Sequence, residues 1–517
     1  MALSWSAALA KFVNTWAHVA LSTMNNLRSQ PHLYEINTWA WLEELSERAG
    51  RHVTLAEVPD VEWNRLAGLG FDLIWLMGVW ERSPESRREF RGDAASFATF
   101  KKAMPGATMQ DVVGSAYSIL RYQPDPYIGD WASLDATRDK LHARGLRLIL
   151  DFVPNHVALD HPWGLEQPEY FIQGTAEDFA RDPSAYYRAE TYSGTRYIAR
   201  AKDPYFPPWR DVAQLNYFKS AMRAALLAEL GTMAKHCDGF RCDMAMLVLN
   251  DIFAKTWSSL LAGAVPPVAE FWREVRGALP DKILLAEAYW GTEGRLFELG
   301  FDFAYDKTLY DAIRGGDASA VRADISSDLD YQSHLARFLE NHDEARSAAV
   351  FIGEKLTAAA TLVATLPGLR FYHQGQLEGR RIQLPVALSH AASEQPDPAI
   401  EALYRQLLQI SNEQVFHAGA YRRLDAGDLG DGTAANLIVY DWQTENCWKL
   451  VVVNLGNEAS QARIQVGDRI APGRRYRFND QLNQTVYLRD GDELRGAGLY
   501  VRLEAFHAHL FEIAPAA

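Results

Sequence analysis

Eight short apolar runs recur along the chain, and longer segments with helical spacing separate them. The runs begin at Leu33, Phe71, Leu146, Gly239, Lys282, Phe301, Ala336 and Leu369. Most are apolar almost without interruption, which is typical of strands that are covered on both faces in a parallel sheet. Amphipathic stretches between them, such as residues 133–144 and 219–235, indicate βα units. Because a closed parallel barrel of this kind needs eight strands, the pattern predicts an α/β fold with a (β/α)₈ barrel.

Two long excursions interrupt this rhythm, at residues 81–113 and 157–215. Loops of this length are usually functional, and on a barrel those that follow strand ends rim the C-terminal face, where such enzymes place their active sites. The second excursion follows the third apolar run and is rich in Pro, Tyr, Trp and Asp. We expect it to form a short inserted subdomain within a barrel that spans residues 31–414.

Both ends of the chain depart from the barrel pattern. Beyond residue 415 the apolar residues alternate, and Asp-Gly and Gly-Asn turns separate the runs, which predicts an antiparallel β domain over residues 415–517. These runs begin at Leu437, Lys449, Thr485 and Leu499. Residues 1–30 carry apolar side chains at helical spacing without a basic leader region or a small-residue cleavage site. We therefore expect an amphipathic helix packed on the body of the protein, not a signal peptide.

The formal net charge of −14 limits the classes of partner. Nucleic-acid binding draws most of its affinity from Lys and Arg that neutralise phosphates, so this acidic chain is not expected to bind nucleic acid. No uninterrupted apolar stretch reaches the length of about 18 residues that a membrane span needs. The three cysteines, Cys237, Cys242 and Cys447, match neither a disulfide framework nor metal-ligand spacing, which favours a reducing compartment and a cytoplasmic location.

Three acidic residues stand at the ends of predicted strands. Asp243 follows Arg241 by two positions in an extended run, so both side chains share a face and the guanidinium is expected to keep the carboxylate ionised, as a nucleophile requires. Glu287 ends an apolar run without an adjacent basic residue, surroundings that raise the pKa of a carboxyl group and suit a proton donor. Asp343 ends the seventh run, next to His342. Carboxylates that converge at one face of a barrel indicate glycoside hydrolysis.

Four segments carry a resemblance to a known family. DFVPNH from Asp151, GFRCDM from Gly239, LLAEAYW from Leu284 and FLENHD from Phe338 resemble, in order and in spacing, the four signature motifs of the α-amylase family, glycoside hydrolase family 13. The resemblance covers essentially the whole chain. It implies a glycosidase or transglycosidase that acts on α-linked glucosides with retention of configuration.

The resemblance also implies roles for individual positions of this sequence. Asp243 would form the covalent glycosyl-enzyme intermediate, and Glu287 would protonate the leaving oxygen and then activate water or an acceptor. Asp343 would bind sugar hydroxyls and stabilise the oxocarbenium-like transition state, while Arg241 would orient Asp243.

Further positions match substrate and metal contacts of the family. Tyr117, in GSAYSILRY, falls where the family places an aromatic platform under the sugar ring, and His156 and His342 would hydrogen-bond the hydroxyls of that ring. Many relatives use the asparagine of the first motif to bind a structural calcium, which makes Asn155 a candidate calcium ligand. Calcium needs about six to eight oxygen ligands, and the sequence does not identify the others. The predicted chemistry itself requires no cofactor.

Some positions depart from the pattern of starch-degrading relatives. After Asp243, where many of them carry a lysine and a histidine, this chain has the apolar residues 244–247. Ser118 stands where many glucosidases of the family have an aspartate, and the usual glutamate after the eighth run is displaced to Glu378 by Gln376 and Leu377.

The leading hypothesis is a retaining hydrolase that cleaves α-glucosidic bonds in short oligosaccharides or glucosides. The alternative is a transglycosidase or phosphorylase, in which a sugar or a phosphate replaces water in the second step. A non-catalytic carbohydrate-binding homologue would be expected to have lost a carboxylate, whereas Asp243, Glu287 and Asp343 are all present. The expected partner is a small carbohydrate, and the sequence leaves the oligomeric state open.

Overall fold

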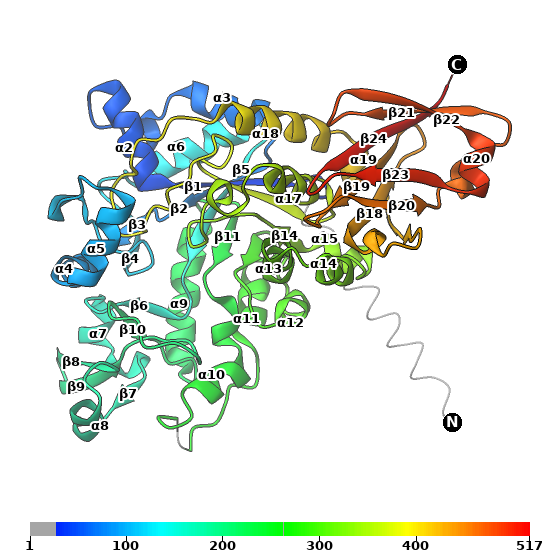
Figure 1. Ribbon diagram of the computed structural model, residues 1–517. Coiled ribbons are helices and arrows are strands. Elements are labelled where there is room, and N and C mark those ends of the chain that lie inside the picture. The colour runs from blue at the N-terminus through cyan, green and yellow to red at the C-terminus, as the bar shows by residue number, and fades with distance from the viewer. Residues whose placement is uncertain (1–26, 262, 517) are drawn as a thin grey trace, which may run out of the picture.

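A computed structural model describes residues 27–261 and 263–516 (Figure 1). Each of the eight apolar runs forms one strand of a closed parallel barrel, so the predicted (β/α)₈ architecture is confirmed. In order around the barrel these strands are β1 (His32–Asn37), β15 (Leu369–His373), β14 (Leu335–Arg337), β13 (Phe303–Tyr305), β12 (Ile283–Ala286), β11 (Gly239–Cys242), β5 (Arg147–Phe152) and β2 (Leu73–Met77). The helix predicted for residues 1–30 falls mainly on residues 1–26, which lie outside the described residues.

The barrel strands are buried on both faces, which explains their nearly continuous apolar sequences. In β2, Leu73, Trp75 and Met77 join the cluster inside the barrel, while Ile74 and Leu76 pack outward against the surrounding helices. The main helices on the outside are α2 (Thr38–Ala49), α3 (Asp60–Gly68), α6 (Trp131–His142), α9 (Ser220–Met233), α11 (Phe271–Ala278), α12 (Glu293–Glu298), α13 (Lys307–Gly315), α14 (Ala318–Asp324), α17 (Glu354–Thr365) and α18 (Pro398–Ser411). The two amphipathic stretches singled out in the sequence correspond to α6 and α9 within two residues at each end.

The first excursion is more regular than its polar sequence suggests. It contains β3 (Trp80–Arg82), α4 (Pro84–Gly92) and α5 (Ala94–Ala103), and β3 pairs with β4 (Ile119–Pro124) in an antiparallel ribbon. Ser83 and Asp93 start the two helices by accepting hydrogen bonds from the backbone N–H groups of Ser86 and Ser96, as good N-cap residues do.

The second excursion forms small antiparallel sheets of its own. Its elements are β6 (His156–Ala158), α7 (Pro162–Glu166), β7 (Gln173–Gly174), α8 (Ala176–Arg181), β8 (Tyr186–Thr191), β9 (Gly194–Ala199) and β10 (Val212–Gln214). Strand β10 pairs with β6, and β9 lies between β7 and β8. The pairing of β10 with β6 brings residue 214 back beside residue 156, at the end of the barrel strand β5.

The C-terminal residues form two antiparallel sheets. The first has six strands in the order β16 (Ala420–Leu424), β18 (Leu437–Gln443), β19 (Trp448–Asn454), β24 (Ala508–Pro515), β21 (Arg475–Asp480) and β22 (Thr485–Asp490). The second has three, in the order β17 (Ala426–Gly427), β20 (Ser460–Ile464) and β23 (Leu499–Leu503). The continuous run expected from Leu499 is in fact two strands in different sheets, because the chain turns at Phe506, whose φ is +59°.

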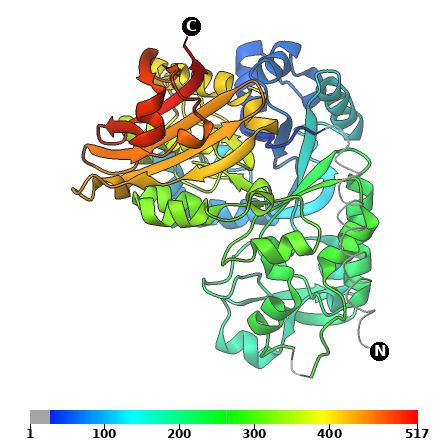
Figure 2. The same ribbon diagram turned by 90° about the vertical axis from the view of Figure 1, so that its right-hand side faces the viewer.

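Two views show how these parts are arranged. Figure 2, turned by 90° from Figure 1, also places the C-terminal sheets and the inserted elements β6–β10 at opposite ends of the molecule, with the barrel between them. In the described part of the chain, none of the helices has both the length and the apolar character that crossing a bilayer demands.

Candidate active site

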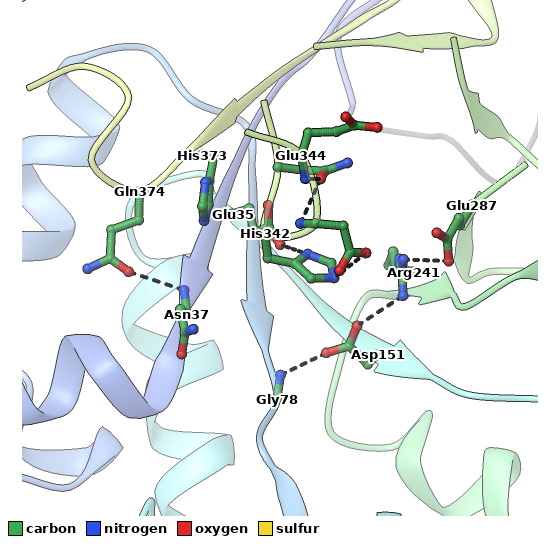
Figure 3. A network of polar contacts seen from close by, with 12 residues as sticks. Glu35, Asn37, Gly78, Asp151, Arg241, Glu287, His342, Glu344, His373 and Gln374 are labelled. Atoms are coloured by element: carbon green, nitrogen blue, oxygen red, sulfur yellow. Dashed lines mark hydrogen bonds and ion pairs between the residues drawn. The ribbon is translucent and has the colours of Figure 1, made fainter. Parts of the chain in front are cut away.

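One arginine holds two of the three predicted carboxylates. Arg241 lies in β11, Asp243 directly follows that strand, and Glu287 directly follows the neighbouring strand β12. Arg241 Nη1 donates to Asp243 Oδ1 at 2.7 Å, and Nη2 donates to Glu287 Oε2 at 2.6 Å. All three residues are buried. Two acidic side chains that are far apart in sequence therefore meet at a single guanidinium. Figure 3 shows the contact of Arg241 with Glu287.

The guanidinium of Arg241 is itself fixed by its surroundings. Its carbon lies 5.1 Å from the ring centroid of Trp75 and 5.3 Å from that of Tyr117, distances at which a cation and an aromatic ring attract. Nε donates to Tyr305 Oη at 3.3 Å, and Asp151 Oδ1 lies 3.9 Å from Nη1. These contacts fix the position of Arg241, and Arg241 in turn fixes the positions of the two carboxylates bound to it.

Asp151 is a third acidic group on the same arginine, and a glycine positions it. Its Oδ2 accepts a hydrogen bond of 2.8 Å from the backbone N–H of Gly78. Gly78 has a φ of +75°, and a Cβ there would lie 2.9 Å from the Cβ of Ala116, so no other residue fits without strain. Burial raises the pKa of Asp151 to about 6, although Arg241 favours the charged form.

Burial changes the expected protonation of Asp243. The sequence predicts that Arg241 keeps the pKa of Asp243 low, and this prediction is wrong: burial, with the negative charges of Asp343 and Asp151, raises that pKa above its ordinary value despite the arginine. For Glu287 the direction agrees with expectation, since burial raises its pKa to about 7. The charge of Asp343 contributes to the pKa of both groups, so the three carboxylates act on one another electrostatically.

Glu287 has a hydrogen-bond donor on each oxygen. Besides Arg241, Oε2 accepts from the backbone N–H of Met244 at 2.8 Å, and Oε1 accepts from the phenol of Tyr289 at 2.7 Å. Met244 and the next residue after the tyrosine, Trp290, have φ values of +41° and +62°. Bulky residues adopt positive φ only when the surrounding structure enforces it, and such strain gathers at functional sites.

The third carboxylate, Asp343, is bound to the histidine that precedes it. His342 Nε2 lies 3.0 Å from Asp343 Oδ2 and 2.8 Å from Tyr117 Oη, and its Nδ1 lies 2.5 Å from Glu35 Oε1. Burial opposes the charged imidazole, but the two carboxylates raise the pKa of His342 well above its usual value. The surrounding protein removes some water from the carboxylate of Asp343, which acts to raise its pKa, but His342 holds that pKa below the ordinary range. The side chain of Asp343 is 54% exposed, so this group opens toward solvent.

A second set of polar groups supports the loop that carries Asp343. The fully buried Glu340 accepts from Arg346 Nη1 at 2.6 Å and from the backbone N–H of Ser347 at 2.7 Å. Arg346 Nη1 also lies 2.8 Å from Nδ1 of His373. Asn341 Oδ1 accepts from the backbone N–H of Asp343 at 2.9 Å. These bonds fix the turn between β14 and α16 (Ser347–Val350) that presents Asp343.

His156 lies next to Tyr117, but its pKa is shifted in the opposite direction to that of His342. His156 begins β6 and its ring lies 5.4 Å from that of Trp209. Burial lowers the pKa of His156 to about 4, although Asp211 and the backbone of Tyr117 favour the charged form. A neutral imidazole next to Tyr117 can both donate and accept a hydrogen bond.

The environment of Asn155 does not fit calcium. Gln214 Nε2 lies 3.0 Å from Asn155 Oδ1, 2.9 Å from the backbone oxygen of Asn155 and 3.1 Å from that of Leu215. This amide nitrogen, a hydrogen-bond donor, stands where a cation would have to lie among those oxygens. Within residues 27–261 and 263–516, the one group of three possible His, Cys, Asp or Glu metal ligands is elsewhere, at Glu413, Cys447 and Glu512.

Large exposed aromatic side chains lie in the segment that follows Glu287 and in the inserted segment. Trp290 is 43% exposed and its ring lies 5.0 Å from that of Tyr205, which is 65% exposed. Tyr205 and the equally exposed Phe206 belong to the inserted segment, where Asp203 accepts hydrogen bonds from both of their backbone N–H groups. Exposed aromatic groups that are held in place like this are typical of binding surfaces.

Sequence reasoning missed Glu35, Asp151 and Tyr289 as site residues. Asp151 and Tyr289 stand within the motif segments that were recognised, so the motifs themselves carried the signal. Glu35 gave a weaker signal: it is a charged residue in the middle of an otherwise apolar predicted strand, and such residues are rarely buried without a partner.

Comparison with known proteins finds a matching family model and similar sequences. The family model for the catalytic domain of α-amylase matches residues 62–384. The α-amylase MalA of Haloarcula japonica is 29% identical over 357 residues, which are 66% of this chain and 47% of that protein. The oligo-1,6-glucosidase of Parageobacillus thermoglucosidasius is 22% identical over 358 residues, which are 60% of this chain and 59% of that protein.

The solved structures agree on the fold. A crystal structure of the maltogenic α-amylase AmyB from Thermotoga neapolitana, described as noncanonic, superposes with a TM-score of 0.66 at 19% identity and covers 95% of this chain and 99% of that one. The chain spans about half the length of the first curated relatives, 47% of one and 52% of another.

Proposed function

The chain belongs to the α-amylase family and is one of its glycosidases, and on that premise we propose that it hydrolyses α-glucosidic bonds in short oligosaccharides or glucosides with retention of configuration. The observation that carries this proposal is the shared arginine, because Arg241 binds Asp243 and Glu287 through adjacent nitrogen atoms. Retaining enzymes hold their two carboxyl groups about 5 Å apart, too close for an intervening water. Two carboxylates on one guanidinium fit that spacing.

In the first step Asp243 attacks the anomeric carbon while Glu287 gives its proton to the leaving oxygen. The bond between the anomeric carbon and that oxygen breaks, and a glycosyl ester forms on Asp243. The pKa of about 7 at Glu287 keeps part of the enzyme in the protonated form near neutral pH. Arg241, in contact with both groups, stabilises the carboxylate of Glu287 as it forms.

In the second step Glu287, now ionised, takes a proton from water, and the water oxygen replaces Asp243 at the anomeric carbon. Two inversions give the α-anomer as product. Asp343 is ionised beside His342 and is placed to accept hydrogen bonds from ring hydroxyls and to stabilise the positive charge of the transition state. Tyr117, which contacts both His342 and Arg241, forms the wall on which the ring packs.

The proposed preference for small substrates rests on the residues that follow the catalytic groups. Met244 directly follows Asp243, and Trp290, three residues after Glu287, contacts Tyr205 of the inserted segment. This chain also lacks the polar pair that many starch-degrading relatives carry after the nucleophile. A sugar unit stacks on aromatic surface through its apolar face. The same apolar surroundings favour the second candidate function, glucosyl transfer or phosphorolysis, because they exclude water from the acceptor position.

The test is the release of an aryl alcohol from an aryl α-glucoside, with Glu287→Gln as the variant. We expect kcat to fall by about 10³-fold or more through loss of the acid and base. Proton NMR of the first-formed sugar should show the α-anomer, and a β-anomer would contradict the assignment of Asp243. Products from maltose, isomaltose, sucrose and trehalose, with and without glucose or phosphate, separate hydrolysis from transfer and phosphorolysis.

A further inference from the structure

Glu35 is a buried carboxylate in the barrel, and it has no role in the proposed mechanism. It lies in β1, its residue is 0% exposed, and Oε1 is 2.5 Å from Nδ1 of His342. Its other oxygen, Oε2, has no hydrogen-bond partner among the described residues. Figure 3 shows Glu35 beside His342, on the side away from Arg241.

A buried carboxylate is costly unless a cation compensates it. The nearby arginines are committed elsewhere, because Arg241 binds Asp243 and Glu287, and Arg346 binds Glu340. The imidazole of His342 is therefore the group that can compensate Glu35. As an imidazolium it has two N–H groups, one for Glu35 and one for Asp343 and Tyr117, so every contact around its ring becomes a hydrogen bond that it donates.

Of the charged or titratable groups around His342, some raise its pKa and others lower it. They are Glu35 from β1, Asp343 from the same loop, Tyr117 from the segment before β4, Asp151 from β5, Arg241 from β11 and His373 from β15. Burial and the cation at Arg241 disfavour a charged imidazole. Glu35 and Asp343 are the two carboxylates in direct contact with it, and their combined effect exceeds that of burial.

We propose that Glu35 is a positioning residue for catalysis: it keeps His342 in the imidazolium form, which holds Asp343 ionised and oriented toward the sugar. This role rests on the proposed function of Asp343. The charges alternate along one line, from carboxylate to imidazolium to carboxylate, and only the last group faces solvent. Without Glu35 the histidine can lose one of its two ring protons, and Asp343 then loses the positive charge that keeps it ionised.

The first experiment follows the charge of His342 without measuring activity. Protein with ¹³C-labelled histidine is titrated by NMR, and the signal of His342 is assigned as the one missing in His342→Gln. In the wild type we expect His342 to remain an imidazolium through neutral pH. In Glu35→Gln its titration should move down by about 1–3 pH units, and Glu35→Asp, which keeps the charge, should shift it less.

The second experiment measures kcat and KM as functions of pH on an aryl α-glucoside. In Glu35→Gln we expect kcat to fall by about 100-fold, the loss typical of a misplaced catalytic group, with a smaller change in KM. The acidic limb should move to higher pH because the pKa of Asp343 rises. Glu340→Gln is the matched control for the position of the acidic limb, since Glu340 is equally buried but contacts His373 and not His342. Because Glu340 also supports the turn that carries Asp343, this variant is expected to lower kcat without moving the limb.

The outcomes separate this inference from the proposed function. A His342 that is neutral at pH 7 in the wild type overturns the inference even if Glu35→Gln does not fold. So does an unchanged His342 titration in Glu35→Gln, or an equal shift in Glu340→Gln. If the titration shifts as expected but the wild type cleaves no α-glucoside, the proposed function fails and the effect of Glu35 on His342 stands.

Discussion

His342 and His373 are both buried histidines with Nδ1 near a fully buried glutamate, yet their charge states differ. His342 Nδ1 lies 2.5 Å from Glu35, and its pKa is raised well above the usual value. His373 Nδ1 lies 3.2 Å from Glu340, and its pKa is lowered. Burial lowers the pKa of both, but Arg346 lies 2.8 Å from His373 and already compensates Glu340. In this protein a buried glutamate stabilises the charged form of the neighbouring histidine where no arginine contacts that glutamate.

The largest effect is expected from removing that arginine. In Arg346→Met, Glu340 loses its permanent cation and stays buried, which should reduce the free energy of unfolding by about 3–5 kcal/mol. His373 should become the compensating cation, and its pKa should rise. Urea denaturation and the histidine NMR titration measure the two effects. A variant as stable as the wild type, with His373 still neutral at pH 6, would contradict the conclusion that Arg346 compensates Glu340.

A loss of activity is expected when the charged histidine is replaced. His342→Gln keeps a donor of similar length but no positive charge, so Asp343 should be less well fixed and its pKa should rise. We expect kcat/KM on an aryl α-glucoside to fall by about 100-fold, with the acidic limb shifted to higher pH. Replacement of the neutral histidine in His373→Gln should leave the position of that limb unchanged, and an equal shift in both variants argues against the distinction.

The two histidines compensate oxygen atoms in a charged and a neutral form, and Gln214 is a second neutral donor that is surrounded by oxygens. Its amide nitrogen lies close to three oxygens of Asn155 and Leu215, so we expect EDTA to leave the Tm of the wild type unchanged. Gln214→Asp removes the donor and adds a carboxylate, which should cost about 1–3 kcal/mol in EDTA. Calcium should restore part of this loss. A fall in wild-type Tm on addition of EDTA would contradict the assignment of the amide as the filling group.

The smallest effect concerns the pH dependence of stability. The pKa of His342 is higher in the folded protein than the unfolded value of about 6.5, so its stabilising contribution is complete below that pH and is lost as pH rises through the folded pKa. Over that window the free energy of unfolding should fall by up to about 1.4 kcal/mol per pH unit. The difference between wild type and His342→Gln isolates this slope. A slope of the opposite sign would show that His342 is neutral in the folded state.

The barrel could be predicted because its signal is local. Most of the eight runs, from Leu33 to Leu369, are apolar almost without interruption, and each became a strand. The motif residues Arg241, Asp243 and Glu287 also meet as their positions at strand ends predict. The break at Phe506 was missed because the residues around it continue the strand pattern, and only the backbone turn reveals the change of sheet.

The remaining features depend on contacts between distant residues. Glu35 and His342 are 307 positions apart, and nothing in either local sequence announces the pairing. The pKa of Asp243 depends on the sum of burial, Arg241 and two other carboxylates, whereas the sequence showed only the neighbouring arginine. Gln214 acts through the oxygens that the pairing of β10 with β6 brings to it.

The pairing of β1 with β15 sets the order in which the site can assemble during synthesis. Glu35 belongs to the first barrel strand to leave the ribosome, and β15, which closes the barrel against that strand, ends at His373. Domains fold as units once their sequence is available, so the nascent chain holds an incompletely paired first strand until β15 has been translated. We expect that a truncated chain without β15 leaves Glu35 incompletely buried and does not form the line of charges from Glu35 through His342 to Asp343.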